Sequence, residues 1–455
     1  MIFLAEPNVY GRSRVTINGS TCIETILSQE NTQFTINEDI DLGGKSVTVG
    51  PGSQLVFKNS ILRNGTLILG RNCGISNGRF QDVSITIESG VVLKKCSFEN
   101  PNKNTCISTN NLTPKTNITI DGCDFVNVGN NLTTTSSVHC IYINSSSSVA
   151  VNNCTFSNIG NLFTQKVSGI SVNTSNQKEG KELILRDIKV TNNTFCNMIS
   201  RSNISGDSHN TGEYHFIILS SSDDVLVRSN MIKNDKESIG YGKEAIYLKC
   251  TDAVVEKNTI EGFFSGEAVI CVKNYTKENV SASPHVDVIH NKIRGTFFAA
   301  IYHTGNGNII RNTIVNTQAY AISCENNRSE DGHIFVIEKN NIKVGTIVPE
   351  VSTGTARAPI TLLSYENKPV KAVIKKNTIQ SDSQIETIRC RFAYDIDLEL
   401  NNNNINSNGK VVSFTNLSGY EKSFKLKTRK VSNLKGELIK QPQSSRFSVF
   451  DVTNE

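Results

Sequence analysis

The sequence contains no tryptophan, and its apolar fraction of 37% is modest for a compact globule. A large excess of charge of one sign is also missing: 47 basic and 42 acidic residues leave a net charge of +5, a balance that does not predict a nucleic-acid-binding protein. No stretch approaches the roughly 18 consecutive apolar residues of a membrane-spanning helix. We therefore expect neither nucleic acid nor membrane among the partners of this 455-residue chain.

Other common signals are missing too. The twelve cysteines include no C-x-x-C pair and no zinc-ligand spacing, so the sequence predicts neither a zinc site nor a disulfide framework. Asn-Gly hairpin turns between alternating runs are mostly missing, which argues against an antiparallel sandwich. Residues 1–7 lack the basic and apolar regions of a signal peptide. We expect an extracellular, cell-surface or virion-associated protein, whose signal was removed or whose export follows another route.

What the sequence does contain is a short repeat, in which a Val or another apolar residue is followed five positions later by Phe or Ile. Clear copies occupy residues 151–156, 190–195, 227–232, 255–260 and 288–293. Further copies end at Phe98, Phe125, Ile314, Ile342, Ile379 and Ile405. A fixed motif with variable spacing indicates a repeat architecture with loops inserted into a constant coil.

One column of the motif is nearly invariant in type. Two residues before each final Phe or Ile, it contains Cys96, Cys123, Cys154, Asn193, Asn230, Asn258, Asn291, Asn312, Asn340, Asn377 and Asn403. Asn tolerates the left-handed backbone of a tight corner, and stacked Asn amides can hydrogen-bond from coil to coil. Cys is a small apolar substitute for the amide at the first three positions, and we expect core thiols there rather than bridges.

A second short strand accompanies each copy, as in Cys140-Ile-Tyr-Ile, Ala245-Ile-Tyr-Leu and Ala300-Ile-Tyr-His. Two or three such strands per coil, stacked in parallel, predict an all-β fold, a right-handed parallel β-helix (solenoid) with a short N-terminal capping segment. We expect a cap with a short helix over residues 21–28 in 1–39, the β-helix over 40–416, and a basic C-terminal cap or tail over 417–455. Ser20 or Thr21 is the expected helix N-cap.

The strand-corner-strand copies with their Asn column resemble the pectin-lyase-like superfamily of right-handed parallel β-helices, over roughly residues 40 to 416. The leading segment, Asp41 to Val49 and Arg63 to Leu67, is similar to β-helix proteins of gut Bacteroidetes and their phages. The resemblance implies a carbohydrate polymer as partner. It covers polysaccharide lyases, polygalacturonase-type hydrolases, phage tailspikes and non-catalytic adhesins. Fold alone does not choose among these.

In the polygalacturonase-like members, catalytic residues lie just before the small residue that opens the second strand. Transferred to this chain, that rule selects the column Thr105, His139, Ser168, His215, Glu244, Glu267, Ala299, Tyr320, Ala358 and Glu386. Glu244 and Glu267 on successive coils would lie ~5 Å apart, a separation at which like charges raise one pKa and which favours a retaining hydrolase. We expect these two residues to be catalytic, with His215 assisting; the same carboxylates could instead hold Ca²⁺.

The outward position of the second strand forms another column: Tyr142, Ser171, Ile218, Tyr247, Ile270, Tyr302, Ser323, Thr361 and Arg389. Tyr142, Tyr247 and Tyr302 present aromatic faces that suit sugar rings. His139, Lys249, Lys273 and Arg389, with Arg391, would contact the polymer, the cations favouring an anionic sugar.

Plainer interpretations exist for each residue. A Glu at a strand edge is often simply solvated, His139 and His303 can be structural, and the Tyr column can shield strand edges. Asp223-Asp224 is best interpreted as a solvated turn. The family's Asn-Thr-Asp, Gly-Asp-Asp, Gly-His-Gly and Arg-Ile-Lys motifs are absent. Two hypotheses follow: a polysaccharide-degrading hydrolase or lyase, or a non-catalytic glycan-binding spike or adhesin, for which a homotrimer is the analogous assembly.

Overall fold

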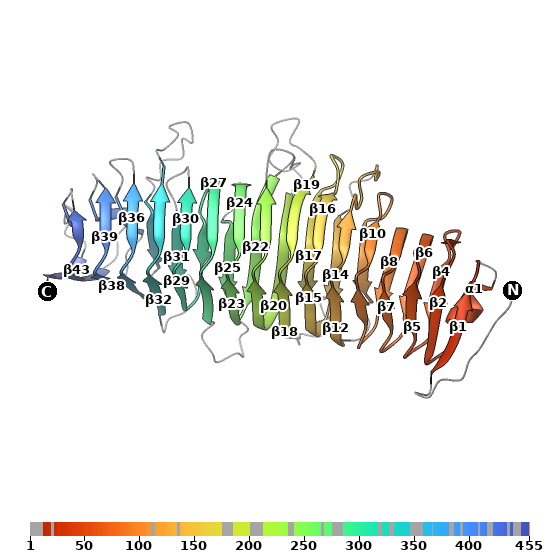
Figure 1. Cartoon of the computed structure of the whole chain (residues 1–455). Coiled ribbons are helices and arrows are strands. Elements are labelled where there is room, and N and C mark those ends of the chain that lie inside the picture. Colours follow the sequence, from red (N-terminus) through yellow and green to blue (C-terminus); the bar gives the residue numbers. More distant parts are fainter. Residues whose placement is uncertain are drawn as a thin grey trace. The chain divides into compact units, whose positions relative to one another are not determined.

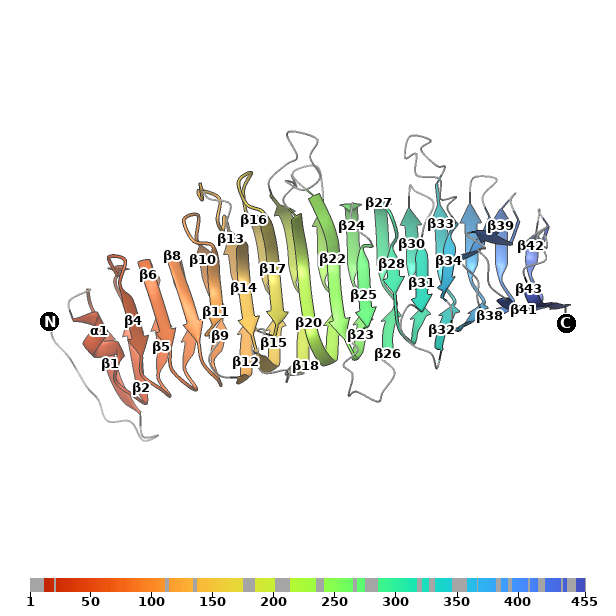
Figure 2. The same cartoon turned by 180° about the vertical axis from the view of Figure 1, so that it is seen from behind.

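The computed structural model describes residues 12–19, 22–110, 114–133, 137–174, 185–200, 213–234, 241–264, 268–274, 285–316, 321–326, 332–345, 358–365, 367–381, 386–391, 395–407, 410–415, 422–434, 437–439 and 447–454. The chain forms two compact units, unit 1 (Met1–Gly242) and unit 2 (Lys243–Glu455). In each unit short strands stack in parallel, and three strands make one coil, so the fold is the predicted parallel β-helix (Figure 1, Figure 2).

Unit 1 contains one short helix and the first strands. They are β1 (Ser13–Ile17), α1 (Ile23–Leu27), β2 (Thr32–Ile36), β3 (Ile40–Asp41), β4 (Ser46–Val49), β5 (Gln54–Phe57), β6 (Ile61–Leu69), β7 (Gly74–Ser76), β8 (Arg79–Ile87), β9 (Val92–Lys94), β10 (Ser97–Glu99), β11 (Thr105–Thr109), β12 (Lys115–Asp121), β13 (Asp124–Val126), β14 (Val138–Asn144), β15 (Ser146–Asn152), β16 (Thr155–Ile159), β17 (Lys166–Asn173), β18 (Leu185–Thr191), β19 (Thr194–Met198), β20 (Glu213–Arg228) and β21 (Met231–Asn234).

Unit 2 contains the remaining strands, the first of which begins at the unit boundary. They are β22 (Tyr241–Cys250), β23 (Asp252–Glu256), β24 (Thr259–Phe264), β25 (Ile270–Asn274), β26 (His285–Ile289), β27 (Lys292–Phe297), β28 (Ile301–His303), β29 (Gly307–Ile310), β30 (Thr313–Asn316), β31 (Ile322–Asn326), β32 (His333–Glu338), β33 (Asn341–Val344), β34 (Ile360–Ser364), β35 (Val370–Lys375), β36 (Thr378–Ser381), β37 (Ile388–Arg391), β38 (Asp395–Asn401), β39 (Asn404–Ser407), β40 (Val412–Thr415), β41 (Lys422–Arg429), β42 (Ser432–Leu434) and β43 (Phe447–Asn454).

Three sheets run along each unit. Sheet 1 holds the predicted second strands: β11, β14, β17 and the start of β20 in unit 1, and β22, β25, β28, β31, β34, β37 and β40 in unit 2. Sheet 2 follows it along the chain, with β12, β15 and β18 in unit 1 and β23, β26, β29, β32, β35, β38 and β41 in unit 2. Sheet 3 completes the coil with β10, β13, β16, β19 and β21, and with β24, β27, β30, β33, β36, β39 and β42. Residues at matching positions of successive strands form the rows used below.

The corner between sheets 2 and 3 is built on the Asn column, as the sequence predicted. In unit 2 each ladder amide donates to the amide oxygen of the next ladder Asn, at 2.9 or 3.0 Å from Asn258 through Asn377. The same nitrogen donates to a strand carbonyl, as Asn340 does to Ile309 at 2.7 Å. These bonds satisfy polar groups that are less than 2% exposed.

In unit 1 thiols fill this corner at Cys96, Cys123 and Cys154, and the Asn ladder begins at Asn193, whose amide donates to the Asn230 amide oxygen at 3.0 Å. Cys154 is buried and donates to the Ile120 carbonyl, while all twelve cysteines are free. Beside the thiols, Phe98, Phe125 and Phe156 stack face to face, with ring centroids 4.9 and 4.8 Å apart. The column contains Phe from Phe98 to Phe195 and Ile from Ile232 onward, and all these side chains are buried, so the motif's last residue is core throughout.

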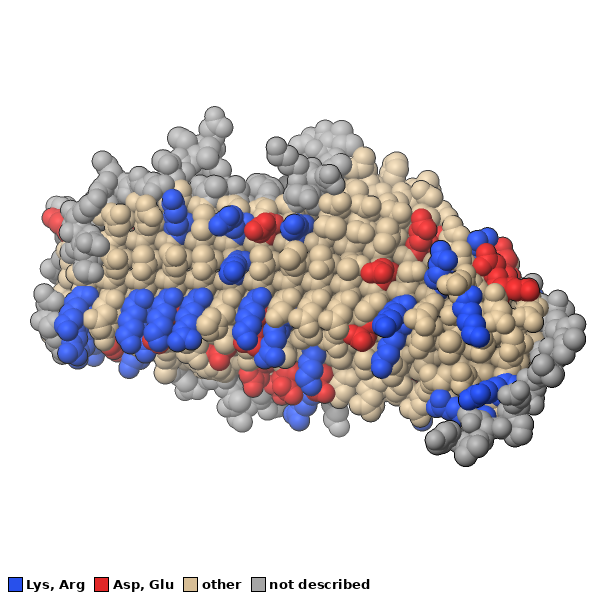
Figure 3. Space-filling view, viewed as in Figure 1, with Lys and Arg blue, Asp and Glu red and all other residues tan. Residues whose placement is uncertain are grey.

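The residue before each ladder position has a left-handed backbone. In unit 1 these residues are Lys95, Gly122, Asn153, Asn192 and Ser229, and in unit 2 they are Lys257, His290, Arg311, Lys339, Lys376 and Asn402. Lys430, which precedes Val431, takes the same position one coil further, because Asn404 pairs with Ser432. All these residues have φ between 50° and 64°. We call the unit 2 set the corner row. Figure 3 shows Lys and Arg side chains in a line over this part of unit 2.

The N-terminal segment contains the predicted short helix. Ile23, Ile26 and Leu27 of α1 are buried, which explains the apolar spacing. The N-cap is Cys22, with a left-handed backbone and no side-chain capping bond, whereas the expected caps Ser20 and Thr21 lie outside the described residues. Parallel pairing already joins β1 to β2 inside this segment, and β41 to β43 inside the expected C-terminal cap. No described helix is long and apolar enough to cross a membrane.

Candidate functional site

Sheet 1 of unit 1 brings together part of the predicted catalytic column. Thr105, His139, Ser168 and His215 pair in register on successive strands, as expected. His139 Nδ1 lies 2.6 Å from Ser168 Oγ, and the His139 ring lies 4.9 Å from the ring of Tyr142. His215 is 4% exposed, and its Nε2 lies 3.4 Å from a carboxylate oxygen of Glu213.

Burial decides the charge of this row. It lowers the pKa of His139 to about 4, with further lowering by the positive charge of Lys166 and by His215. A neutral imidazole at neutral pH lets Nδ1 accept the Ser168 hydroxyl proton. Ser168 is itself fully buried, so this pair joins neighbouring coils and does not expose a nucleophile. The structural interpretation of His139 is therefore favoured.

Sheet 1 of unit 2 presents the aromatic row. Tyr247, Cys271 and Tyr302 pair in register on β22, β25 and β28, so the two tyrosines lie two coils apart, roughly 10 Å. Both are half-buried and pack against Ala268, Cys271 and Ala299. These small neighbours leave the tyrosine rings standing above the sheet.

Cations lie beside this row. Lys249 pairs with Lys273 on the neighbouring strand, two residues after Tyr247 and Cys271 respectively. The Lys273 ammonium lies 6.0 Å from the centre of the Tyr247 ring, the range of a cation–π contact. Burial raises the pKa of the Tyr247 hydroxyl, so it stays protonated at neutral pH. The combination offers an apolar ring face with positive charge at its edge.

A buried carboxylate adjoins the second tyrosine. Tyr302 donates its hydroxyl to Glu325 Oε2 at 2.5 Å, and Glu325 is only 7% exposed. Burial first, and then Glu325, raise the pKa of Tyr365 to about 12. Arg391 occupies the strand position opposite Leu363, which in turn lies opposite Glu325. The sequence analysis missed Glu325 and Tyr365, since neither lies in the two columns that it followed.

The predicted pair of Glu244 and Glu267 stays a prediction. The register of β22 with β25 pairs Ile246 with Ile270, which by the same offset places Val269, and not Ala268, opposite Ala245. The column of small residues was therefore predicted one residue out of register at this strand. For the same reason Cys271, and not Ile270, lies in the tyrosine row. Glu267 lies outside the described residues, while Glu244 is buried at 1% exposure.

The other predicted residues can also be compared with the structure. His215 belongs to unit 1 and Glu244 to unit 2, so a joint catalytic site stays a prediction. Arg389 is 1% exposed, and its Nη2 lies 2.8 Å from Glu386 Oε2, so its charge is compensated inside the protein. Asp223 lies within β20, where it pairs with Arg186 at 3.6 Å, and not on a turn between strands. Among the described residues no three His, Cys, Asp or Glu side chains gather as a metal site.

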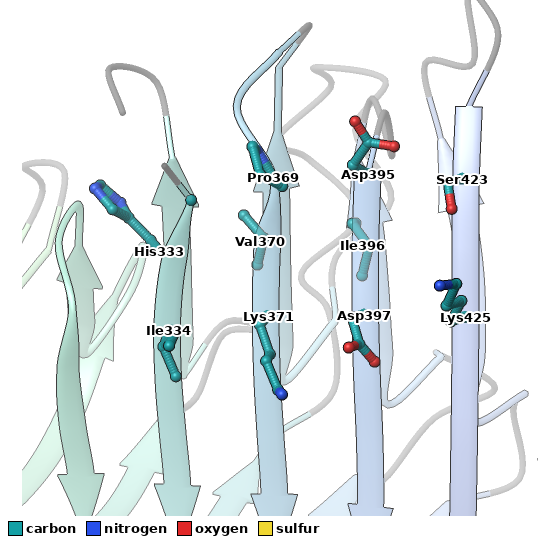
Figure 4. A pocket seen from close by; sticks show the side chains of 11 residues that line it. His333, Ile334, Pro369, Val370, Lys371, Asp395, Ile396, Asp397, Ser423 and Lys425 are labelled. Atoms are coloured by element: carbon teal, nitrogen blue, oxygen red, sulfur yellow. The ribbon is translucent and has the colours of Figure 1, made fainter. Parts of the chain in front are cut away.

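A separate cavity of about 280 Å³ lies on sheet 2 of unit 2 (Figure 4). Lys371, Asp397 and Lys425 form one row across its floor, with Asp395 above them. Burial raises the pKa of the Asp395 carboxyl. The cavity lies on sheet 2 and none of its lining residues belongs to the tyrosine row, so we keep the row and not the cavity as the candidate site.

Known proteins offer no further guide to this site. Comparison of the chain with protein-family models, with curated proteins and with solved structures gives no match.

Proposed function

We propose that this protein is a carbohydrate-active β-helix that binds an anionic polysaccharide along sheet 1 of unit 2. The observation that carries the proposal is the row of Tyr247 and Tyr302, two coils apart over small residues, with Lys249 and Lys273 beside it. Sugar rings stack on aromatic faces because both present apolar C–H surface, while the phenol hydroxyl remains available for hydrogen bonds. Two rings at this spacing suit alternate sugars of an extended chain.

The cations define the expected sugar. Lys249 and Lys273 are neighbours of like sign on adjacent strands, so together they present positive charge beside the tyrosine row. A carboxylate or sulfate on the sugar would be attracted to them. The preferred ligand is therefore a uronate-containing or sulfated polymer, and a neutral glucan is disfavoured.

Cleavage is the second candidate function, supported by the carboxylate beside the row. Glu325 accepts the Tyr302 hydroxyl at 2.5 Å and is largely excluded from water. A buried carboxylate joined to a phenol at a sugar-binding surface can move a proton, as both hydrolases and lyases require. In this proposal Tyr302 faces the sugar, and the Glu325 carboxylate accepts and returns the proton of the Tyr302 hydroxyl. Glu244 is a second acid near the row: after burial and Cys271, its charge adds to the raised pKa of the Tyr247 hydroxyl, but Glu244 is itself buried at 1% exposure.

Binding is tested on a panel of linear polysaccharides by affinity electrophoresis and titration calorimetry. The double variant Tyr247→Ala/Tyr302→Ala should weaken binding at least tenfold, whereas Tyr247→Phe/Tyr302→Phe keeps the ring faces and should retain most of it. Phe163→Ala removes an aromatic side chain that is 56% exposed on unit 1 and serves as the control. If the alanine double variant binds as wild type does, the proposal is wrong.

Cleavage has its own test. Release of reducing ends or unsaturated products should be lost in Glu325→Gln while binding persists. Product release by wild type that Glu325→Gln leaves unchanged would exclude this residue. We further propose that the protein works outside the cell or on a virion and that it assembles as a homotrimer. Light scattering on the purified protein measures this oligomeric state directly.

A further inference from the structure

The corner row of unit 2 gives a second charged surface, distant from the tyrosine row along each coil. Six of the seven residues of the row, Lys257 to Asn402, donate their backbone N–H to a carbonyl of the next coil, as Lys339 does to Lys375 at 3.1 Å and Lys376 to Asn401 at 2.9 Å. The side chains therefore leave the same corner one coil apart, about 4.8 Å. All seven are exposed. Five of the seven, Lys257, Arg311, Lys339, Lys376 and Lys430, are cations.

The backbone does not explain this composition. An L-residue in the left-handed region costs roughly 1–2 kcal/mol, and Gly, Asn and Asp are the residues that adopt it readily. At the equivalent positions unit 1 has Gly122, Asn153 and Asn192, besides Lys95 and Ser229. Unit 2 has Asn only at Asn402, and the other positions contain His290 and five long basic side chains, although Gly or Asn would suit this backbone better. A stability cost repeated along a row indicates a gain in function.

Neighbouring acids do not cancel the row. The position just before it contains the acids Glu256 and Glu338 and the cations Lys375 and Arg429, which balance. Glu338 is shared between Lys339 at 3.0 Å and Lys375 at 3.2 Å, so one carboxylate serves two ammonium groups. Lys339 is therefore partly compensated, whereas no ion pair among the described residues involves Lys257, Arg311, Lys376 or Lys430. Figure 3 shows Lys and Arg side chains in a line over this part of unit 2.

We propose that the corner row binds a linear anionic polysaccharide that lies along the stacking direction, with about one charged group for each coil. A row of single cations at a regular spacing of about 4.8 Å matches a polymer with one carboxylate or sulfate per sugar ring. Duplex DNA carries one charge per about 1.7 Å of its axis and winds its phosphates away from a straight row. An anionic membrane would contact a broad patch and not one line. This surface is independent of the tyrosine row and does not rest on its proposed function.

The row offers variants that should keep the fold. The row variant combines Lys257→Asn, Lys339→Asn and Lys376→Asn. It places Asn at the corner of three coils, as Asn402 already is at the corner of another. Because Asn suits the left-handed backbone, we expect the thermal midpoint of this row variant to be equal to or higher than that of wild type. The matched control, Lys371→Gln, Lys410→Gln and Lys425→Gln, removes three positive charges from unit 2 away from the corner.

The experiment measures binding of polygalacturonate to the full chain by titration calorimetry at low and at physiological salt. Wild type and the control should bind alike, the row variant at least tenfold more weakly, and binding should weaken as salt rises. The same titration in the Tyr247→Ala/Tyr302→Ala background isolates the corner, where the loss caused by the row variant should persist.

Four results would overturn the proposal. The first is no binding of polygalacturonate by wild type, and the second is an equal loss in the control, which would show that net charge and not position matters. The third is that a 20-base-pair DNA duplex, or vesicles of phosphatidylcholine and phosphatidylserine, bind more tightly than polygalacturonate and lose that binding in the row variant. Loss of binding in the tyrosine variant alone would support the sheet 1 site and contradict the corner.

Discussion

Replacing one amide of the ladder should test how strongly the Asn column holds the coils together. Asn340 is 1% exposed, and its amide oxygen accepts from both the backbone N–H and the side chain of Asn312, at 2.9 and 3.0 Å. Its amide nitrogen donates to Ile309 and to Asn377, at 2.7 and 3.0 Å. In Asn340→Ala the Asn312 N–H and the Ile309 carbonyl both lose this partner in a buried site.

Each buried polar group left unsatisfied costs about 1–3 kcal/mol, so Asn340→Ala should lower the free energy of unfolding by roughly 2–6 kcal/mol. Equilibrium urea unfolding followed by far-ultraviolet circular dichroism measures this loss. Asn340→Cys should lose less, because Cys fills the same column at Cys96, Cys123 and Cys154. The control Asn406→Ala, at an exposed position of β39, should change stability by less than about 0.5 kcal/mol. Equal values for Asn340→Ala and Asn406→Ala would refute the reasoning.

Two further outcomes concern stability. Burial lowers the pKa of His303 to about 4, so below about pH 6.5 this histidine is protonated in the unfolded chain and still neutral in the folded chain. The free energy of unfolding of wild type should therefore fall as pH drops from about 6.5 to 4, and urea titrations of His303→Gln should show a shallower fall. The same pH dependence in wild type and His303→Gln would count against this origin. Gly295 has φ 149°, and a Cβ there would lie 1.8 Å from the Gly262 carbonyl oxygen, so Gly295→Ala should prevent folding to soluble protein. The control Gly43→Ala, with no atom within 4 Å of the added Cβ, should be expressed as soluble protein. Soluble, stable Gly295→Ala protein would contradict the geometry.

Much of the fold was predictable because one motif repeats the same buried pattern. The Asn column and the Phe or Ile column lie where the spacing placed them, since each copy must fill the same corner and the same core. The second-strand columns were also predictable, with Thr105 to His215 and Tyr142 to Ile218 in register. Strands at both ends of the chain continue the stacking where the motif itself fades.

The site was harder to predict, because a one-residue shift moves a side chain to the other face. Val269 fills a position that Ala245 and Ala300 occupy in nearby coils, so Cys271 takes the place that was predicted for Ile270 in the tyrosine row. Glu325 and Tyr365 come together only through pairing of strands far apart in sequence. The corner row, in contrast, can be located in the sequence, because six of its seven residues directly precede a ladder Asn, and only the left-handed backbone was needed to show their common direction.

The central functional proposal is that Tyr247 and Tyr302 form one binding surface, and titration calorimetry with oligouronates of increasing length tests it most directly. Wild-type affinity should rise steeply at the length that first spans both rings, roughly 10 Å apart, and the rise should vanish in Tyr302→Ala. An affinity that grows with length in the same way in wild type and Tyr302→Ala would show that the two tyrosines do not share a ligand.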